Sequence, residues 1–241
     1  MHKNSYVLLF AATVTITCSL LLASAATLLR DRQQENIALD MRKNILESAG
    51  LINPQSPETT REQILKIYDE NITSHVINLQ GSLVEDREVY DLDPKKDVDL
   101  LPIFYAEKND QITSYIIPIS GKGLWSTIYG YLALEPDVTT VMGITFYKHG
   151  ETPGLGGEIE KDWFKKNFVG KKIFSPEGEL VSVGVVKGKV AEKIPEEESY
   201  HYVDGISGST LTGNGLTNFL KADLKKYEPF LRKVKNNEME H

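Results

Sequence analysis

Residues 204–212 read DGISGSTLT, a run of small and hydroxyl-bearing residues directly before the last segment with helical periodicity. Its two glycines permit backbone conformations that are closed to other residues, and the small neighbours let a ligand approach the main chain. Free amides and the dipole at the start of a helix both favour a negative charge. The run therefore predicts an anion site at the N-terminus of a helix that begins near Leu211. A simple helix cap accounts for Ser207 or Thr210 equally well, so both interpretations stay open.

The segments on either side of this run predict an α+β fold. Runs rich in β-branched and aromatic residues predict strands at residues 75–84, 113–119, 138–148, 173–174 and 180–187, with a hairpin turn at 176–179. Apolar residues at helical spacing predict helices from about 37 to 50, after Thr59 or Thr60, at 161–168 and at 211–233. Because strands and helices do not alternate regularly, we expect a mostly antiparallel sheet with flanking helices rather than a doubly wound parallel sheet.

The N-terminus predicts a membrane helix. Residues 6–29 carry no charge, and a helix of that length, at about 1.5 Å per residue, is long enough to cross roughly 30 Å of hydrocarbon. A cleaved signal peptide is the alternative, because Lys3 precedes the run and Ala23-Ser24-Ala25 is similar to a cleavage site. The length of the run favours the anchor. We therefore expect an anchor at 1–32, a helical connecting segment at 33–74 and one main domain at 75–241.

Composition excludes several classes of function. The net charge of −7 disfavours nucleic acid as a partner, because a phosphate-binding surface needs an excess of Lys and Arg. The single cysteine, Cys18, lies in the apolar run, which excludes disulfides, paired-cysteine zinc sites and cysteine-ligated clusters elsewhere. Cys18 itself is either a redox or metal ligand or a small apolar filler. Neither a GxGxxG run after a strand nor a nucleotide-hydrolase phosphate loop is found, so the sequence offers no NADH site.

A second informative stretch, HGETPGLGG, covers residues 149–157. Four glycines and a proline in nine residues predict a shaped loop at the end of a strand, and such a main chain can lie against a flat ring system. A loop of this composition is also common as a plain connector. A third stretch, GKGLWSTIYGYLAL at 121–134, contains Trp125, which either flanks a ligand or belongs to the core.

Together, these stretches resemble the FMN-binding domain family. Residues 204–210 are similar to the motif D-G-x-S/T-G-A-T, with Ser209 in the alanine position, and residues 149–156 are similar to H-x-E-T-P-G-L-G. The run at 121–130 resembles the version in the NqrC family, the C subunits of sodium-translocating NADH:quinone reductases. The G subunit of the related Rnf complex is the alternative within the FMN-binding domain family.

The resemblance implies a covalent flavin. In the family a flavin transferase takes FMN from FAD and esterifies its phosphate to the last threonine of the motif, here Thr210, with Thr212 as the nearest alternative acceptor. Such a subunit relays single electrons between other subunits of the complex, and it needs neither a catalytic side chain nor a metal ion. The further residues that the resemblance implies for cofactor binding are Asp204, Ser207, Gly208, Ser209, Thr212, Glu151, Thr152, Gly154, Leu155, Gly156 and Trp125.

The resemblance also implies a location. The family places this domain in the periplasm, anchored in the lipid bilayer of the bacterial inner membrane with a cytoplasmic N-terminus. Charge predicts the opposite, because Lys3 alone precedes the apolar run whereas Arg30, Arg32, Arg42 and Lys43 follow it. We follow the family, because its flavin transferase is exported. The alternative of another class is a non-redox, membrane-tethered binding module in which residues 207–212 only cap a helix.

Overall fold

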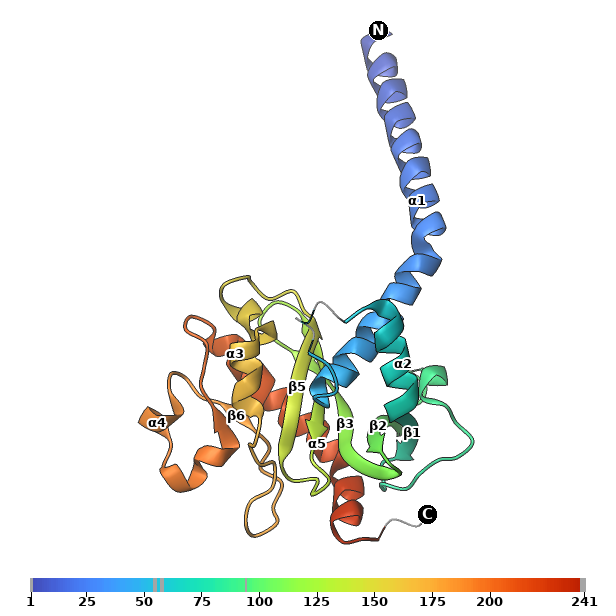
Figure 1. The fold of residues 1–241 in the computed structure, drawn as a ribbon. Helices are drawn as coiled ribbons and strands as arrows, with labels where there is room; N and C mark the ends of the chain where they lie inside the picture. Colours follow the sequence, from blue (N-terminus) through green and yellow to red (C-terminus); the bar gives the residue numbers. More distant parts are fainter. Residues whose placement is uncertain (1, 54–55, 57–58, 94, 239–241) are drawn as a thin grey trace. The chain divides into compact units, whose positions relative to one another are not determined.

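The computed structural model describes residues 2–53, 56, 59–93 and 95–238. Contacts between residues divide the chain into two units, Met1–Asp40 and Met41–His241. The described part of the first unit is helical throughout and belongs to α1 (His2–Ser48), which also begins the second unit (Figure 1).

The first unit presents an apolar helical surface. Within the described residues, α1 is the one helix that is long and apolar enough to cross a membrane, as judged by length and composition. The hydroxyl groups of Thr13, Thr15 and Thr27 donate to the carbonyl oxygens four residues earlier, at 2.8 to 2.9 Å. These bonds satisfy the polar side chains without water, as a helix in lipid requires.

The second unit is built on a five-stranded antiparallel sheet whose strands follow one another in chain order. A separate pair of short parallel strands lies after the main sheet in the sequence. The predicted α+β fold with a mostly antiparallel sheet is therefore confirmed. The strands of the main sheet are β1 (Ile72–Asn78), β2 (Leu100–Lys108), β3 (Gln111–Lys122), β4 (Thr127–Leu134) and β5 (Val141–Lys148), and the parallel pair is β6 (Gly184–Val185) and β7 (Tyr202–Val203).

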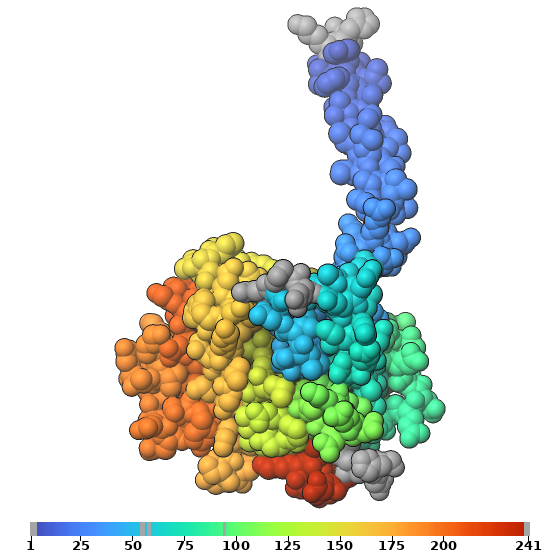
Figure 2. Space-filling model, in the orientation of Figure 1, coloured from blue at the N-terminus to red at the C-terminus, as the bar shows by residue number. Residues whose placement is uncertain are grey.

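Helices cover both faces of the main sheet (Figure 1). The long helix α5 (Thr210–Lys235) packs on one face, where Ile117 and Ile119 of β3 join the core that contains Leu216 and Leu220. The end of α1 and helix α2 (Arg61–Asn71) lie on the other face and conceal much of it (Figure 2). Alternation of side chains along the strands supplies apolar residues to both layers.

Two polar contacts fix α5 where β2 and β3 part. The ladder between these strands runs from the Lys108–Gln111 pair and stops at the Phe104–Ile116 pair. Beyond that pair, the hydroxyl group of Tyr227 donates to the carbonyl oxygen of Pro102 at 2.8 Å. The amide of Ser120 donates to Asp223 at 2.7 Å. Side chains of α5 thus bind one backbone group on each of the two strands that have separated.

The smaller helices begin where the sequence allows. Thr60 caps α2 in a reciprocal arrangement with Gln63, which confirms the expected start of this helix. The helix expected at 161–168 consists of two consecutive turns of different type. The remaining short helices are η1 (Val89–Asp91), η2 (Gly156–Glu160), α3 (Asp162–Lys165), η3 (Lys166–Phe168), α4 (Val190–Lys193) and η4 (Glu196–His201).

Several strand predictions were wrong. The strand expected at 75–84 is β1, which ends at Asn78 because the chain turns at Gly81, where a side chain would collide with the backbone of Phe230 at 2.3 Å. The expected strands at 173–174 and 180–187 reduce to a bridge between Phe174 and Leu180 and to the two residues of β6, although the turn at 176–179 between them is confirmed. Strands β2 and β4 had no prediction.

Candidate functional site

Three segments of the chain meet at the carboxylate of Glu151. This side chain follows β5 and is only 4% exposed. Its two oxygens accept hydrogen bonds from the backbone amides of Leu124 at 3.2 Å, Trp125 at 3.0 Å and Ser126 at 3.4 Å. The hydroxyl group of Thr212 in α5 donates to the same carboxylate at 2.7 Å. One charged group therefore joins the turn after β3, the loop after β5 and the first turn of α5.

The surroundings of this carboxylate admit no extra side chains. A Cβ atom at Gly156 would lie 2.6 Å from the hydroxyl oxygen of Thr212, and one at Gly123 would lie 2.6 Å from a carboxylate oxygen of Glu151. Both distances are shorter than real contacts of a Cβ atom. Glycine at these two positions is therefore a condition for the bonds of Glu151.

The hydrogen bonds also decide the charge of Glu151. Burial raises the pKa of this carboxyl group, but the bonds from Thr212 and from the amides of Trp125, Leu124 and Ser126 outweigh burial, and the net pKa lies below the ordinary value. The group is therefore ionised at neutral pH. Hydrogen bonds to an ionised carboxylate are stronger than bonds between neutral groups, so Glu151 holds the three segments together firmly.

The two threonines of the motif differ in their environment. Thr212 is 1% exposed and its hydroxyl group is bound to Glu151. Thr210 is the first residue of α5, is exposed and lines a cavity of about 320 Å³. Thr210 therefore presents the available hydroxyl group, whereas Thr212 serves the packing of the loops.

The cavity at Thr210 has three walls: the segment at 185–189, the GISGS run at 205–209 and the first turn of α5. Asp204 holds the first wall, since it accepts the amide of Val190 at 2.8 Å and pairs with Lys189 at 2.8 Å. Lys189 and the Val190 amide keep the pKa of Asp204 below its ordinary value. Gly205 approaches the carbonyl oxygen of Val186 too closely for any side chain. The lining residues are Val185, Val186, Lys187, Gly188, Lys189, Gly205, Ile206, Ser207, Gly208, Ser209, Thr210, Gly213 and Asn214.

The residues at this helix start fit a phosphate group. Ser209 occupies the position before α5, yet its side chain makes no capping hydrogen bond. Its hydroxyl oxygen is buried and has no hydrogen-bond partner in the part of the chain that the structure describes. The first amides of a helix have no acceptor within it, so they and the helix dipole attract an anion. A phosphate ester at Thr210 meets this requirement.

The loop at 149–157 lies against the DGISGST run. Gly208 has a φ of 75°, and a Cβ atom there would lie 2.9 Å from the side chain of Leu155. Gly154 turns the loop with the same φ of 75°. The carbonyl oxygen of Thr152 accepts the amides of Leu155 and of Gly157, at 3.1 and 2.9 Å. Two stretches that are distant in sequence thus form one surface.

Exposed apolar side chains come from the three joined segments. The amide of Trp125 is bound to Glu151, but its side chain is exposed, so the interpretation of Trp125 as a core residue was wrong. The sequence predicted Trp125 and Leu155 as site residues, but it missed two other exposed apolar residues in these segments. Leu124 and Leu211 belong to the same set, and their only sequence signal is an apolar residue beside a glycine-rich or hydroxyl-rich motif. The exposed fractions are 39% for Leu124, 70% for Trp125, 43% for Leu155 and 61% for Leu211.

The predicted site residues from the three stretches therefore gather around Glu151 and Thr210. Ser207 is exposed on the cavity wall, and Thr152 is exposed on the loop. The sequence missed the wall formed by Lys187 and Lys189, because its place beside α5 depends on the pairing of β6 with β7. Within the described ranges, no three His, Cys, Asp or Glu side chains come together as metal ligands.

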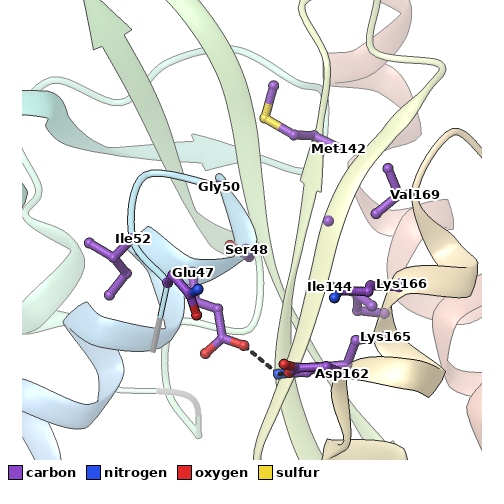
Figure 3. A pocket seen from close by; sticks show the side chains of 12 residues that line it. Glu47, Ser48, Gly50, Ile52, Met142, Ile144, Asp162, Lys165, Lys166 and Val169 are labelled. Carbon is purple, nitrogen blue, oxygen red and sulfur yellow. Dashed lines mark hydrogen bonds and ion pairs between the residues drawn. The ribbon is translucent and has the colours of Figure 1, made fainter. Parts of the chain in front are cut away.

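A second cavity, of about 330 Å³, shares no lining residue with the one at Thr210 (Figure 3). The end of α1, strand β5 and helix α3 line it. Lys165 of α3 binds Glu47 and, at 3.2 Å, Asp162 (Figure 3). Burial lowers the pKa of Lys165, but the two carboxylates outweigh burial and the net pKa lies above the ordinary value. Glu47, Asp162 and Lys165 therefore form an ionic joint, a set of ion pairs that links the end of α1 to α3.

Comparison with known proteins adds independent findings. Residues 123–225 match the model of the FMN-binding domain. The C subunit of the Na(+)-translocating NADH-quinone reductase of Pasteurella multocida is 38% identical, over 95% of this chain and 93% of the relative. The corresponding C subunit of Pseudomonas aeruginosa is 35% identical, over 98% of both chains.

Solved structures agree with the sequence relatives. The crystal structure of the C subunit of the Na(+)-translocating NADH-quinone reductase from Parabacteroides distasonis has a TM-score of 0.73 and 36% identity, and the match covers 84% of this chain and 96% of that one. NqrC from Shewanella oneidensis has a TM-score of 0.68 and 28% identity, with 82% and 97% covered. The fold described above therefore occurs in solved proteins that also resemble this chain in sequence.

Proposed function

Since this chain belongs to the NqrC family, the C subunits of Na(+)-translocating NADH-quinone reductases, we propose that it carries FMN covalently on Thr210 and relays electrons within that complex. As a member of this family, the chain is a subunit of an oxidoreductase complex and contains an FMN-binding domain. The similarity to C subunits favours this family over the alternative of an Rnf-type G subunit. The observation that carries the covalent proposal is the difference between an exposed Thr210 and a buried, hydrogen-bonded Thr212.

The attachment step follows from the chemistry of the acceptor. The hydroxyl oxygen of Thr210 forms a bond to the flavin-side phosphorus of FAD, and the bond from that phosphorus to the bridging oxygen breaks. Adenosine monophosphate leaves, and the proton of the threonine hydroxyl group is released to solvent. A dedicated flavin transferase is the proposed catalyst, because the cavity at Thr210 contains no carboxylate or histidine to act as a base among its lining residues.

The chain's own residues have binding and positioning roles in this proposal. The N-terminal amides of α5 hold the phosphate. Gly156 and Gly208 give the loops their close approach, and Gly154 supplies the positive φ at which the loop turns. The exposed side chains of Trp125 and Leu155 are the proposed apolar contacts of the ring system, and Thr152, whose carbonyl oxygen accepts the Leu155 amide, belongs to the same loop as Leu155. Glu151 acts through the loops that it joins. When bound, FMN supplies the one-electron chemistry.

The exposed position of this apolar surface suits a relay. Electron transfer between proteins needs a short gap between cofactors, and Trp125 and Leu211 are exposed rather than enclosed. Other subunits of the complex are the expected partners, because the relatives are subunits of it. We propose that they approach this surface.

Membrane association follows from the apolar helix α1 together with the relatives, which are subunits of a sodium-translocating complex. We propose that α1 spans the bacterial inner membrane with residues 1–32 as the anchor and 33–74 as a connecting segment. The FMN-binding domain, residues 75–241, then lies in the periplasm. The exported flavin transferase of the family supports this orientation.

The covalent link is tested by producing the full chain together with the flavin transferase. A denaturing gel is inspected under ultraviolet light, and the intact mass is measured. The wild type is expected to fluoresce and to gain the mass of one FMN, whereas Thr210→Ala is expected to lose both. Thr212→Val is the matched control, because it removes a buried hydroxyl group that is not the proposed acceptor. Peptide mapping of this variant is expected to find the flavin on Thr210.

Two results contradict the proposal. A fluorescent Thr210→Ala variant with the flavin on the peptide at Thr212 means that the acceptor was assigned wrongly. An intact wild-type mass equal to that of the bare polypeptide supports the alternative of a non-redox binding module. Either outcome is readable without assembling the complex.

A further inference from the structure

The hydroxyl group of Ser209 is a buried polar group without a partner. Ser209 is 5% exposed, and no hydrogen bond to its hydroxyl oxygen is found among the residues that the structure describes. Buried hydroxyl groups in folded proteins are normally hydrogen-bonded. An orphaned one beside a cavity therefore points to a ligand that supplies the partner.

Helix capping does not explain this serine. A serine before a helix usually has an extended backbone and accepts an amide of the first turn. Thr60 of this chain does so before α2, with a φ of −76° and a ψ of 162°. Ser209 has a φ of −122° and a ψ of 34° and makes no such bond. Its hydroxyl group is consequently free to donate rather than occupied as an acceptor.

The charge around the cavity suits an anion. The lining includes Lys187 and Lys189 and no carboxylate. Lys189 is paired with Asp204, whereas no ion pair of Lys187 occurs in the described part of the chain. The helix dipole of α5 adds positive potential at Ser209 and Thr210. A ligand with a negative charge therefore completes this site better than water or a neutral group does.

We propose that Ser209 is a phosphate ligand: its hydroxyl group donates a hydrogen bond to a non-bridging oxygen of a phosphate bound at the N-terminus of α5. The inference rests on the proposed function for the identity of the phosphate, which is the one esterified to the neighbouring Thr210. Ser209 then fixes the direction in which the ester leaves the helix. Its contribution is binding and orientation, and the hydroxyl group of Ser209 is not consumed.

Inorganic phosphate and flavin-free protein test the site independently of flavin attachment. The full chain is made without the transferase, labelled with 15N-threonine and titrated in detergent. Phosphate is expected to move the amide signals of Thr210 and Thr212 saturably, while Thr113 of β3, which does not line the cavity, serves as an internal control. Ser209→Ala is expected to weaken binding about tenfold, the loss of one hydrogen bond to a charged acceptor. Ser209→Thr keeps the hydroxyl group and is expected to bind as the wild type does.

The matched control is Ser74→Ala, which removes an exposed hydroxyl group of β1 that does not line the cavity. Equal phosphate affinity of the wild type and Ser209→Ala overturns the proposal, as does an equal loss of affinity in Ser74→Ala. Absence of any saturable shift in the wild type overturns it as well. If phosphate binds through Ser209 but the transferase never labels Thr210, the phosphate site stands and the flavin attachment fails. If labelling is normal but Ser209→Ala leaves phosphate affinity unchanged, the flavin attachment stands and the role of Ser209 fails.

Discussion

The position of one hydroxyl group relative to one carboxylate separates two threonines that are two residues apart. Thr212 is bound to Glu151 across 61 positions of sequence, while Thr210 faces the cavity. The motif predicts Thr210 as the acceptor and leaves Thr212 as the nearest alternative. Their difference arises from a contact that no local pattern encodes, so it becomes visible only when the loop after β5 is placed against α5.

Replacement of Glu151 by glutamine tests the role of its charge. A glutamine side chain cannot accept from all four donors, so the free energy of unfolding at pH 7 is expected to fall by about 1–3 kcal/mol. The folded-state pKa of Glu151 is depressed, so its stabilisation is present above the unfolded pKa of about 4.3 and is lost as the pH falls through the folded value. The stability difference between the wild type and Glu151→Gln is therefore expected to shrink below about pH 4.3. Urea unfolding of the full chain in detergent measures it.

Glu179→Gln is the matched control for this prediction. Glu179 lies exposed in the 176–179 turn, so its replacement is expected to change stability by less than about 0.5 kcal/mol at each pH. If the difference in unfolding free energy between the wild type and Glu151→Gln does not change with pH, the ionised carboxylate of Glu151 is not what stabilises the three segments.

At the scale of elements, the ionic joint between α1 and α3 is the clearest unit. Lys165 is 14% exposed and Glu47 is 15% exposed, so the pair is largely shielded from water. Lys165→Ala leaves two carboxylates near each other and is expected to cost about 1.5–3 kcal/mol. The double variant Glu47→Ala with Lys165→Ala is expected to cost less than the two single changes added together. A double-mutant cycle by urea unfolding measures the coupling, and a value near zero contradicts a joint.

Local signals account for which elements were predictable. Helix α2 begins directly after Thr60 because Thr60 and Gln63 cap each other within four residues, and α5 shows helical spacing of apolar residues over a long segment. Strand β2 contains Pro102, which lacks an amide and weakens a strand pattern. Strand β4 contains Gly130, whose Cβ position lies 2.0 Å from the carbonyl oxygen of Thr145. Strands β3 and β5 were predicted although they contain Pro118 and Gly143, so a single Pro or Gly is not by itself the reason that β2 and β4 were missed.

The site shows the same limit. The loop at 149–157 and the DGISGST run were recognisable because each is continuous in sequence. The cavity wall at Lys187 was not recognisable from the sequence. Its position depends on the hydrogen bond from the Val190 amide to Asp204 and on the pairing of two parallel strands of two residues each. Exposure of Trp125 was equally beyond the sequence, which offered core and surface as alternatives. Long-range packing decides these features.

For the whole molecule, orientation is the structural proposal with the sharpest test. Cys18 is the single cysteine, so a Cys18→Ser background with Glu179→Cys carries one thiol, in an exposed turn of the folded unit. A membrane-impermeant thiol reagent is expected to label this position in intact cells if the domain is periplasmic. The matched variant Ser5→Cys, near the N-terminus, is expected to react only after the membrane is opened. The reverse pattern contradicts the proposed orientation and agrees with the charge distribution.

The carboxylate of Glu151 also sets an order of events in the life of the protein. Its partners at 124–126 and at 212 are made at different times by the ribosome, and the acceptor helix comes last. The threonine proposed to receive the flavin therefore acquires its surroundings only after the segments from 124 to 212 have been synthesised and have folded together. If the proposed attachment needs these surroundings, flavin maturation is expected to follow folding, and a misfolded copy is expected to stay colourless.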